Sequence, residues 1–363
     1  MTIPRRSKRI TSEWLNNVLH ITGYLKHINI KSISMESCGE GQGFLGDIAK
    51  LKITYDKESH ELPPTMIVKM PLYRRPKDST VPNFYEREIR CYDELVPISP
   101  IRTPNLIYSS IDSEARRCIL ILEDCSQYKM IDQIDGLNYE QTIQVINSIA
   151  DFHARWWDAP DLFSFEWMPK HNDDLVVEFI DNFRQAWDFS KKSKNFELIF
   201  PEGSRMVGEK IYKQYPWLIN SIPDENLTIA HYDLRAENIF FDSDNSEKPV
   251  IILDWMTASI SVGILDIAYL LALSLKIDLR RKIEKEMIEL YLKRLEAKGI
   301  RGLEFDFIWE FYLRSLLSYV YLPTLAFTTL NRAVPRTFKI QSMSIKRFFT
   351  AIIDNDAIDI LPS

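Results

Sequence analysis

The stretch His-Tyr-Asp-Leu-Arg-Ala-Glu-Asn, residues 231–238, decides the fold of this 363-residue chain. It has the spacing H-x-D-x-x-x-x-N and directly precedes a short apolar run at 239–241, which is typical of a strand. A polar turn separates this run from a second one, and Asp254 follows sixteen residues after Asn238. We therefore expect a hairpin that returns Asp254 to the end at which Asp233 and Asn238 lie.

Three oxygen-bearing side chains at one end of a hairpin suit phosphoryl transfer. This reaction needs a carboxylate to orient the attacking hydroxyl and accept its proton, and oxygen ligands for the Mg²⁺ ions that neutralise a triphosphate. Asp233 suits the first task, and Asn238 and Asp254 suit the second. The alternative is that Asp233 and Asn238 only cap a turn, but the position of Asp254 favours a site. His231 is interpreted as an orienting residue that hydrogen-bonds the backbone, and not as a proton carrier.

The pattern of apolar residues changes from strand-like to helical along the chain. Short alternating runs between residues 33 and 121 predict strands, with one helix at about 83–95. Helical patterns begin with 139–157, and long amphipathic helices return from residue 266. We predict an α+β protein with a small N-terminal β-sheet lobe containing one helix and a large, mainly helical C-terminal lobe. The expected hinge is 122–126, and clefts between lobes are common ligand sites.

Composition indicates a globular protein. Its apolar content of 45% and aromatic content of 12% are those of a chain with a core, and a net charge of −6 gives no reason to expect nucleic acid as a partner. Thr11 predicts a helix N-cap where a secretory signal would continue, and the longest apolar stretch, 316–330, is too polar to span a membrane. We therefore place the chain in the cytoplasm, with no membrane partner. Four cysteines without zinc or disulfide spacing are expected to be free thiols: Cys38, Cys91, Cys118 and Cys125.

The loop and hairpin motifs resemble those of the aminoglycoside phosphotransferase and choline kinase superfamily, close to its ecdysteroid-kinase-like (CHK kinase-like) branches. The segment 147–157 also looks like the superfamily helix L-A-x-x-H-A-x-x-W, and 263–270 resembles its G-x-x-D-L-A stretch. The resemblance covers roughly residues 37–271 and implies the two-lobed protein-kinase fold. It also implies that His153 is a packed structural residue and that Asp266 anchors the catalytic loop.

The resemblance implies a set of nucleotide-binding residues in the N-terminal lobe. Backbone N–H groups of the glycine-rich segment that contains Gly41 and Gly43 would cover the phosphates, with a flexible hairpin turn as the alternative. Lys69 lies in a run similar to V-A-I-K and is expected to hold the α- and β-phosphates. Its expected partner on the next helix is Glu88, with Glu86 as the alternative.

The resemblance also places the adenine site and the lobe boundaries. Backbone groups from Glu123 to Cys125, at the end of the expected hinge strand, would bind the edge of the base. The N-terminal nucleotide-binding lobe would then span 1–124. The C-terminal catalytic and substrate-binding lobe would span 125–363, with a helical insert at about 156–226.

Residues around the motif favour a small molecule as phosphate acceptor. Asp254 is followed by Trp255 and Met256 where protein kinases have Phe-Gly, and no Ala-Pro-Glu motif follows. Arg235 and Glu237, inside the loop, depart from the superfamily pattern and are candidates for influencing substrate choice. The expected function is ATP- and Mg²⁺-dependent transfer of the γ-phosphoryl group to a small-molecule hydroxyl. A pseudokinase that binds nucleotide or metabolite without chemistry, and a protein kinase, are the alternatives.

The helical insert carries two conflicting indications about this acceptor. Its aromatic residues are numerous, which favours core packing for any single ring and leaves an apolar acceptor pocket open for some. Asp174, Glu178 and Asp181 share one helical face that suits a polyamine, although a solvated surface is the simpler explanation. A steroid-like alcohol, an amino-sugar and an amino-alcohol therefore all remain candidate acceptors.

Overall fold

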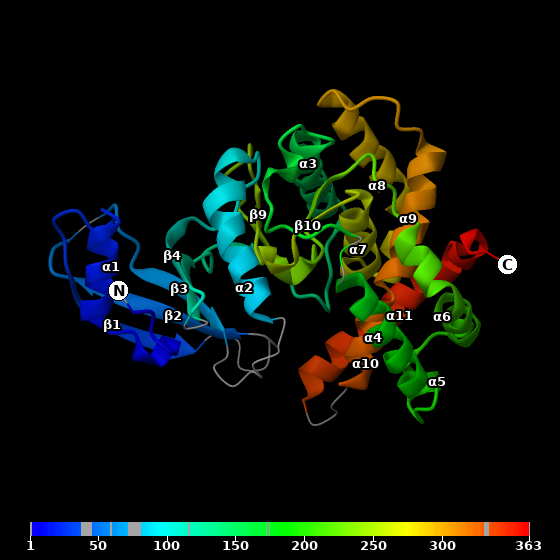
Figure 1. The fold of residues 1–363 in the computed structure, drawn as a ribbon, viewed down its shortest axis with the longest axis horizontal. Helices are drawn as coiled ribbons and strands as arrows, with labels where there is room; N and C mark the ends of the chain where they lie inside the picture. The colour runs from blue at the N-terminus through cyan, green and yellow to red at the C-terminus, as the bar shows by residue number, and fades with distance from the viewer. Residues whose placement is uncertain are drawn as a thin grey trace. The chain divides into compact units, whose positions relative to one another are not determined.

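The computed structural model describes residues 2–37, 46–58, 60–71, 81–114, 117–171, 173, 175–329 and 334–362, and only the backbone at 37, 81–83 and 175–179. The chain forms two compact units, and Figure 1 colours it from blue at the N-terminus to red at the C-terminus. Unit 1 consists of Met1–Lys129 and Leu253–Thr257. Unit 2 consists of Met130–Ile252 and Ala258–Ser363. The short segment that contains Asp254 therefore belongs to the N-terminal unit, although unit 2 surrounds it in the sequence.

A five-stranded antiparallel sheet forms the centre of unit 1, with the strand order β1-β2-β3-β5-β4. Its central strand β3 alternates buried and half-buried residues, as a sheet with one face on a core requires. In the β2–β3 pair, Ile48 lies opposite Lys69. The strands are β1 (Ile30–Ser37), β2 (Gly46–Tyr55), β3 (Thr65–Pro71), β4 (Leu106–Asp112) and β5 (Arg117–Glu123).

Two main helices accompany this sheet. Helix α1 (Ser12–Ile21) begins at the predicted N-cap, since the Thr11 side chain accepts a hydrogen bond from the Trp14 backbone, and it packs on β1 and β4. Helix α2 (Val81–Arg90) continues into the π-helical turn η2 (Cys91–Leu95). The single helix predicted at 83–95 is thus an α-helix with a π-helical end. Two 3-10 turns complete this set: η1 (Ser7–Arg9) and η3 (Val96–Ile98).

Unit 2 is mainly helical, which confirms the predicted α+β class. Its helices are α3 (Tyr139–Trp156), α4 (Leu175–Ser190), α5 (Phe196–Ile199), α6 (Ser204–Asn220), α7 (Ile264–Ser274), α8 (Ile277–Ala297), α9 (Phe305–Tyr319), α10 (Tyr321–Thr328) and α11 (Pro335–Asp354), with 3-10 turns η4 (Leu162–Ser164) and η7 (Ala357–Ile360). Every residue of α7 is buried, and this helix packs against α8, α9 and α11. Such a helix is mostly apolar, and the polar exceptions in α7 include Asp266 and Ser274. Among the described helices, none is long and apolar enough to cross a membrane.

Short strands in unit 2 hold the segment 231–238. Strands β7 (Thr228–Ala230) and β10 (Ser259–Ser261) pair with each other, and the sheet β6-β8-β9 comprises β6 (Lys129–Met130), β8 (Ile239–Phe241) and β9 (Val250–Ile252). The 3-10 turns η5 (Ala236–Asn238) and η6 (Trp255–Thr257) lie next to this hairpin in the sequence. The predicted β8–β9 hairpin is therefore confirmed.

Aromatic residues of the insert mostly fill the interior of unit 2. Trp187 of α4 is fully buried and contacts Phe183, Phe196, Phe200 and Phe349 of α11. The interpretation as core packing is thus confirmed for the buried rings, which are Trp156, Phe165, Phe183 and Trp187. Two others remain about half exposed: Phe163 and Phe189.

The cysteines that the structure describes are free and buried, as predicted: Cys91, Cys118 and Cys125. Cys38 lies outside the described residues. Burial raises the pKa of the Cys118 thiol to about 12. These thiols therefore belong to the packing of unit 1.

Candidate active site

Lys69, Glu88 and Asp254 form an ion-pair group inside unit 1. The Lys69 ammonium donates to Glu88 Oε1 at 2.5 Å and to Asp254 Oδ1 at 3.1 Å. Glu88 comes from α2 and is 1% exposed, and Asp254 lies 185 positions after the lysine in the sequence. The structure thus brings together a strand lysine, a helix glutamate and the aspartate that follows the β8–β9 hairpin.

Burial and the ion pairs shift the pKa values of Lys69 and Glu88 in opposite directions. Burial alone would lower the pKa of Lys69, but the Asp254 and Glu88 carboxylates outweigh it, and the pKa lies above its ordinary value. Burial raises the pKa of Glu88 to about 7, with Lys69 opposing the shift and Asp254 adding to it. Because the ammonium faces two carboxylates, we take Lys69 as charged. A fixed positive charge is what a phosphate-binding lysine requires.

The structure distinguishes the two glutamates considered as partners of Lys69. Glu86 accepts a hydrogen bond from Arg90 one turn further along α2, and its side chain is 37% exposed. Glu88 contacts Lys69 and is buried. The prediction of Glu88 as the partner is confirmed, and the alternative Glu86 is wrong.

Backbone contacts of Trp255 keep the residues after Asp254 within unit 1. Asp254 has a positive φ of 65°, an uncommon backbone conformation for a residue with a side chain. Trp255 is fully buried, and its carbonyl oxygen accepts from Cys91 Sγ at 3.7 Å. The turn η6 packs on α2. The helix that carries Glu88 therefore also holds the turn after Asp254.

The catalytic loop predicted at 231–238 is anchored by Asp266, as the resemblance to the family implied. The Asp266 carboxylate accepts from the His231 backbone at 2.7 Å and from the Tyr232 backbone at 2.8 Å. Tyr232 has a positive φ of 67°. These bonds therefore hold the loop in a backbone conformation that residues other than glycine rarely adopt. His153 Nε2 lies 3.1 Å from Asp266 Oδ2, and its ring is fully buried. Both His153 and Asp266 are thus structural supports, as predicted.

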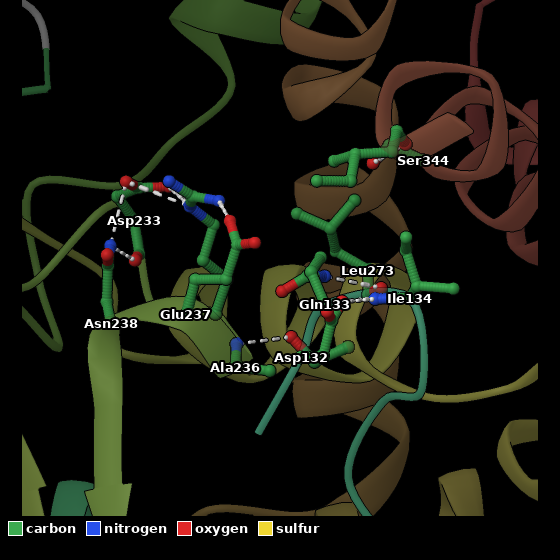
Figure 2. A network of polar contacts seen from close by, with 12 residues as sticks. Asp132, Gln133, Ile134, Asp233, Ala236, Glu237, Asn238, Leu273 and Ser344 are labelled. Atoms are coloured by element: carbon green, nitrogen blue, oxygen red, sulfur yellow. Dashed lines mark hydrogen bonds and ion pairs between the residues drawn. The ribbon is translucent and has the colours of Figure 1, made fainter. Parts of the chain in front are cut away.

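Within this loop, Asp233 and Asn238 contact each other directly. Asn238 Nδ2 donates to the Asp233 carbonyl oxygen at 2.8 Å and to Asp233 Oδ2 at 2.9 Å, as Figure 2 shows. The Asp233 backbone N–H donates to His231 Nδ1 at 3.2 Å, so His231 bonds the backbone as predicted. Because the Asn238 amide nitrogen faces Asp233, its amide oxygen points to the other side. The predicted metal ligand and the predicted catalytic carboxylate are thus held in one turn.

The hairpin register places Asn238 and Asp254 next to the same pair of strand residues. Ile239 pairs with Ile252. Asn238 directly precedes the first of these residues, and Asp254 follows the second by two positions. Sequence spacing predicts this arrangement.

Arg235 and Glu237 are ion-paired with each other and with the proposed base. Arg235 Nε lies 3.2 Å from Asp233 Oδ1, and Arg235 Nη1 donates to Glu237 Oε2 at 2.7 Å. Arg336 at the start of α11 donates to Glu237 Oε1 at 3.3 Å. Sequence reasoning noted the two loop residues but missed Arg336, because no local spacing connects residues 99 positions apart.

Tyr269 is a further neighbour of Asp233 that sequence reasoning missed. Burial raises the pKa of the Tyr269 hydroxyl well above its usual value, and Asp233, with which it shares a hydrogen bond, acts in the same direction. Its ring centroid lies 4.8 Å from that of Tyr319, whose hydroxyl donates to the Tyr232 carbonyl at 3.3 Å. The sequence did contain an indication of this contact. Tyr269 follows the anchor Asp266 by three positions, so both lie on the same face of the helix, toward the loop.

Part of the segment proposed to bind adenine, Glu123 to Cys125, already makes hydrogen bonds within unit 1. The Glu123 backbone N–H donates to the Asn105 carbonyl at 2.9 Å, and Glu123 Oε2 accepts from the Asn105 amide at 2.8 Å. The Cys125 carbonyl accepts from the Tyr128 backbone at 2.9 Å. The backbone beyond Glu123 is therefore the part of this segment that we retain for the base.

Several predicted residues cannot be compared with the structure. Gly41, Gly43 and Asp174 lie outside the described residues, and Glu178 lies where only the backbone is described. Asp181 is exposed. The polyamine-binding face therefore stays a prediction.

The described oxygen groups fit Mg²⁺ in kind. Mg²⁺ prefers hard oxygen ligands, takes one or two of them from the protein and keeps others from phosphate and water. Asn238 offers an oriented amide oxygen and Asp254 offers a carboxylate. Among the described residues, no group of three or more His, Cys, Asp or Glu side chains is arranged to hold a metal.

Solved structures similar to this chain are small-molecule kinases and phosphotransferases. Choline kinase from Cryptosporidium parvum matches with a TM-score of 0.57 at 14% identity, over 94% of this chain and 95% of that one. Ethanolamine kinase from Plasmodium vivax matches with a TM-score of 0.55 at 14% identity, over 94% and 89%. The aminoglycoside phosphotransferase APH(2″)-IIIa, in complex with GDP and kanamycin, matches with a TM-score of 0.54 at 14% identity, over 93% and 99%. The two-lobed kinase-like fold is thereby confirmed.

The sequence profile of the ecdysteroid kinase-like family matches residues 40–156 and 159–302 of this chain. The chain belongs to the ecdysteroid kinase-like family, which confirms the resemblance inferred from the motifs. Family and structural neighbours together indicate a small-molecule kinase or phosphotransferase. No curated protein sequence matches the chain significantly.

Proposed function

We propose that this protein transfers the γ-phosphoryl group of ATP to a hydroxyl group of a small molecule. The observation that carries the proposal is the contact of Lys69 with both Glu88 and Asp254. These residues come from a strand, a helix and the end of a hairpin, and their chemistry matches the lysine, glutamate and metal-binding aspartate of kinases. The complete set favours an active enzyme over a pseudokinase.

Each proposed role follows from the chemistry of the residue. Lys69, held by Glu88, binds the α- and β-phosphates, and backbone groups of Gly41 and Gly43 cover the phosphates. The backbone beyond Glu123, including Cys125, binds the adenine edge. Mg²⁺ bound by Asn238 and Asp254 would neutralise the charge that develops on the triphosphate.

Asp233 is the proposed catalytic residue. Its carboxylate orients the acceptor hydroxyl and accepts the proton as the new oxygen–phosphorus bond forms. The bond between the γ-phosphorus and the β,γ-bridging oxygen breaks, and ADP leaves with the electron pair. Asn238 supports this role because its two bonds to Asp233 fix the direction of the carboxylate.

The proposal keeps the three classes of acceptor that the sequence suggests. The proposal covers steroid-like alcohols, amino-sugars and amino-alcohols; choline, ethanolamine and aminoglycoside kinases among the structural neighbours support the last two classes. We also propose a cytoplasmic location, which the free buried thiols of unit 1 support.

The test is a kinase screen with purified protein, MgATP and a panel of these three classes, corrected for phosphate release in the absence of acceptor. We expect at least one acceptor to be phosphorylated by the wild type. Asp233→Asn should lower kcat by roughly 10²–10⁴-fold, the usual contribution of a positioned acid or base, while the Kd for ATP stays near that of the wild type.

Asp244→Asn is the matched control, because Asp244 is an exposed aspartate in the turn of the same hairpin. It should keep wild-type turnover. Wild-type turnover by Asp233→Asn on a verified acceptor would overturn the role of Asp233, and transfer to a polypeptide in place of a small alcohol would overturn the acceptor class.

A further inference from the structure

Five charged side chains of unit 2 alternate in sign and end on Asp233. Asp132 accepts from Arg336 Nη1 at 2.7 Å, and Arg336 Nη2 donates to Glu237 Oε1 at 3.3 Å. Glu237 Oε2 accepts from Arg235 Nη1 at 2.7 Å. Arg235 Nε then lies 3.2 Å from Asp233 Oδ1. Figure 2 shows Asp132, Glu237 and Asp233 together with the adjoining loop. We call these five residues the charge chain.

The charge chain becomes more shielded toward the loop. Arg336 is 41% exposed, whereas the side chains of Arg235 and Glu237 are 26% and 19% exposed. Ion pairs that are partly removed from water are screened less than surface pairs, which contribute little. The Arg235–Glu237 pair is therefore the stronger part of the chain, and the outer Arg336 pairs support it.

Glu237 is the junction of the charge chain. Each of its two carboxylate oxygens accepts from a different arginine, one in the loop and one in α11. Any rotation of the Glu237 carboxylate away from its present position would therefore break at least one of these two bonds. Since a long arginine side chain is otherwise free in several rotamers, this junction restricts where the Arg235 guanidinium lies.

The position of Arg235 matters because its guanidinium contacts the carboxylate of the proposed base, Asp233. Asn238 Nδ2 binds Asp233 Oδ2, and Arg235 Nε lies near both Asp233 oxygens, at 3.2 and 3.3 Å. If the Arg235 guanidinium moved away, the Asp233 carboxylate could rotate more freely about its Cβ–Cγ bond. Small misplacements of a reacting group lower the rate strongly.

We propose that Glu237 and Arg336 are positioning residues that hold Arg235 against Asp233 and thereby set the direction of the proposed base. The inference rests on the proposed function and goes beyond it, because it assigns the start of α11 a role in the reaction. Asp132 is the outer end of the chain and holds Arg336 in turn.

The test compares Glu237→Gln, Arg336→Gln and Arg336→Lys with the wild type in steady-state kinetics. The substrates are MgATP and an acceptor from the screen, or MgATP with water as the acceptor. We expect kcat to fall roughly tenfold for Glu237→Gln, as for the loss of one hydrogen bond between charged groups. Arg336→Gln should lower kcat about threefold, because that pair is more exposed.

Three further readouts separate positioning from a merely structural role. The KM for ATP should stay within about twofold, since neither Glu237 nor Arg336 is a proposed phosphate-binding residue. Arg336→Lys should recover most of the loss, and Glu237→Gln combined with Arg336→Gln should fall no further than Glu237→Gln alone. Arg205→Gln is the control, because Arg205 forms an exposed ion pair with Glu197 in the same unit.

The outcomes distinguish the two proposals. A wild type without phosphoryl transfer overturns both of them. An active wild type and an inactive Asp233→Asn, with Glu237→Gln and Arg336→Gln at wild-type kcat, overturn the positioning role and leave the proposed function standing. A raised KM at unchanged kcat, or a lowered melting temperature as the only effect, also overturns the positioning role.

Discussion

At the residue scale, the position of Lys69 depends on Glu88. The Glu88 side chain is almost fully buried, and its second carboxylate oxygen has no hydrogen-bond partner among the residues that the structure describes. Burying a carboxylate costs free energy unless the group is paired. The bond to Lys69 compensates this cost for Glu88. In return, Glu88 balances the pull of Asp254 on the ammonium. The lysine is therefore held between two carboxylates from different elements.

We predict that Glu88→Gln weakens the use of ATP. A neutral amide holds an ammonium less strongly, and Lys69 is then drawn toward Asp254, so kcat/KM for ATP should fall roughly 10–100-fold, the equivalent of a charged hydrogen bond. Steady-state kinetics with varied ATP measures this.

Glu86→Gln is the matched control for this prediction. Glu86 carries the same side chain on the same helix but pairs with Arg90. Its replacement should change kcat/KM less than about twofold, as for other exposed pairs. Equal losses in both variants would contradict the assignment of Glu88.

At the element scale, the loop between β7 and β8 is held by the first turn of α7. Asp266 is fully buried and accepts two backbone N–H groups of this loop. His153 from α3 contacts the same carboxylate, and Tyr291 from α8 contacts the other nitrogen of that ring at 3.0 Å. One carboxylate thus connects a loop with an uncommon backbone conformation to two helices.

We predict that Asp266→Asn lowers the free energy of unfolding by about 3 kcal/mol, because buried N–H groups lose an ionised acceptor and face an amide that also donates. Urea denaturation followed by tryptophan fluorescence measures this change. The variant should also lose turnover, since Tyr232 and Asp233 follow directly on the anchored backbone.

Tyr291→Phe tests whether the effect belongs to the anchor. It keeps the ring and removes only the hydroxyl that bonds His153, so it should cost about 1 kcal/mol. Similar losses of stability in both variants would mean that Asp266 does not anchor the loop.

At the scale of the whole molecule, each unit has its own core, and that of unit 2 includes a dense aromatic cluster. Trp187 stacks on Phe183 and on Phe349 of α11, with ring centroids 6.5 and 6.2 Å apart. Gly208 of α6 leaves room for this ring, because a Cβ at that position would lie 2.1 Å from its carbon atoms. Trp187 is thus one of the residues through which the insert packs against α11.

We predict that Gly208→Ala destabilises unit 2, although alanine is the better helix former by about 1 kcal/mol. The added methyl group must displace a fully buried ring, and overpacking of a core usually costs about 1–3 kcal/mol. Thermal and urea unfolding should show the loss.

The Trp187→Phe background provides the control, since a smaller ring leaves space for the methyl group. In that background Gly208→Ala should cost less than in the wild type. A stabilised Gly208→Ala protein would show that the two helices separate without cost at this contact.

Much of the fold and part of the site follow from local patterns in the sequence. Strands follow from the alternation of apolar residues, whereas the anchoring role of Asp266 and the choice of Glu88 came from the resemblance of short motifs to the family. The predicted helix at 83–95 was less accurate, because η2 continues α2 with a different hydrogen-bond pattern that apolar periodicity does not reveal.

By itself, the sequence determined the class of the protein and the end of the hairpin at which Asn238 and Asp254 lie, because strand pairing across a short turn follows from neighbouring residues. Only the tertiary structure decided that Lys69 also contacts Asp254, that Tyr269 contacts Asp233, and that Arg336 reaches the loop. Such contacts join residues up to 185 positions apart, and packing of separate elements determines them.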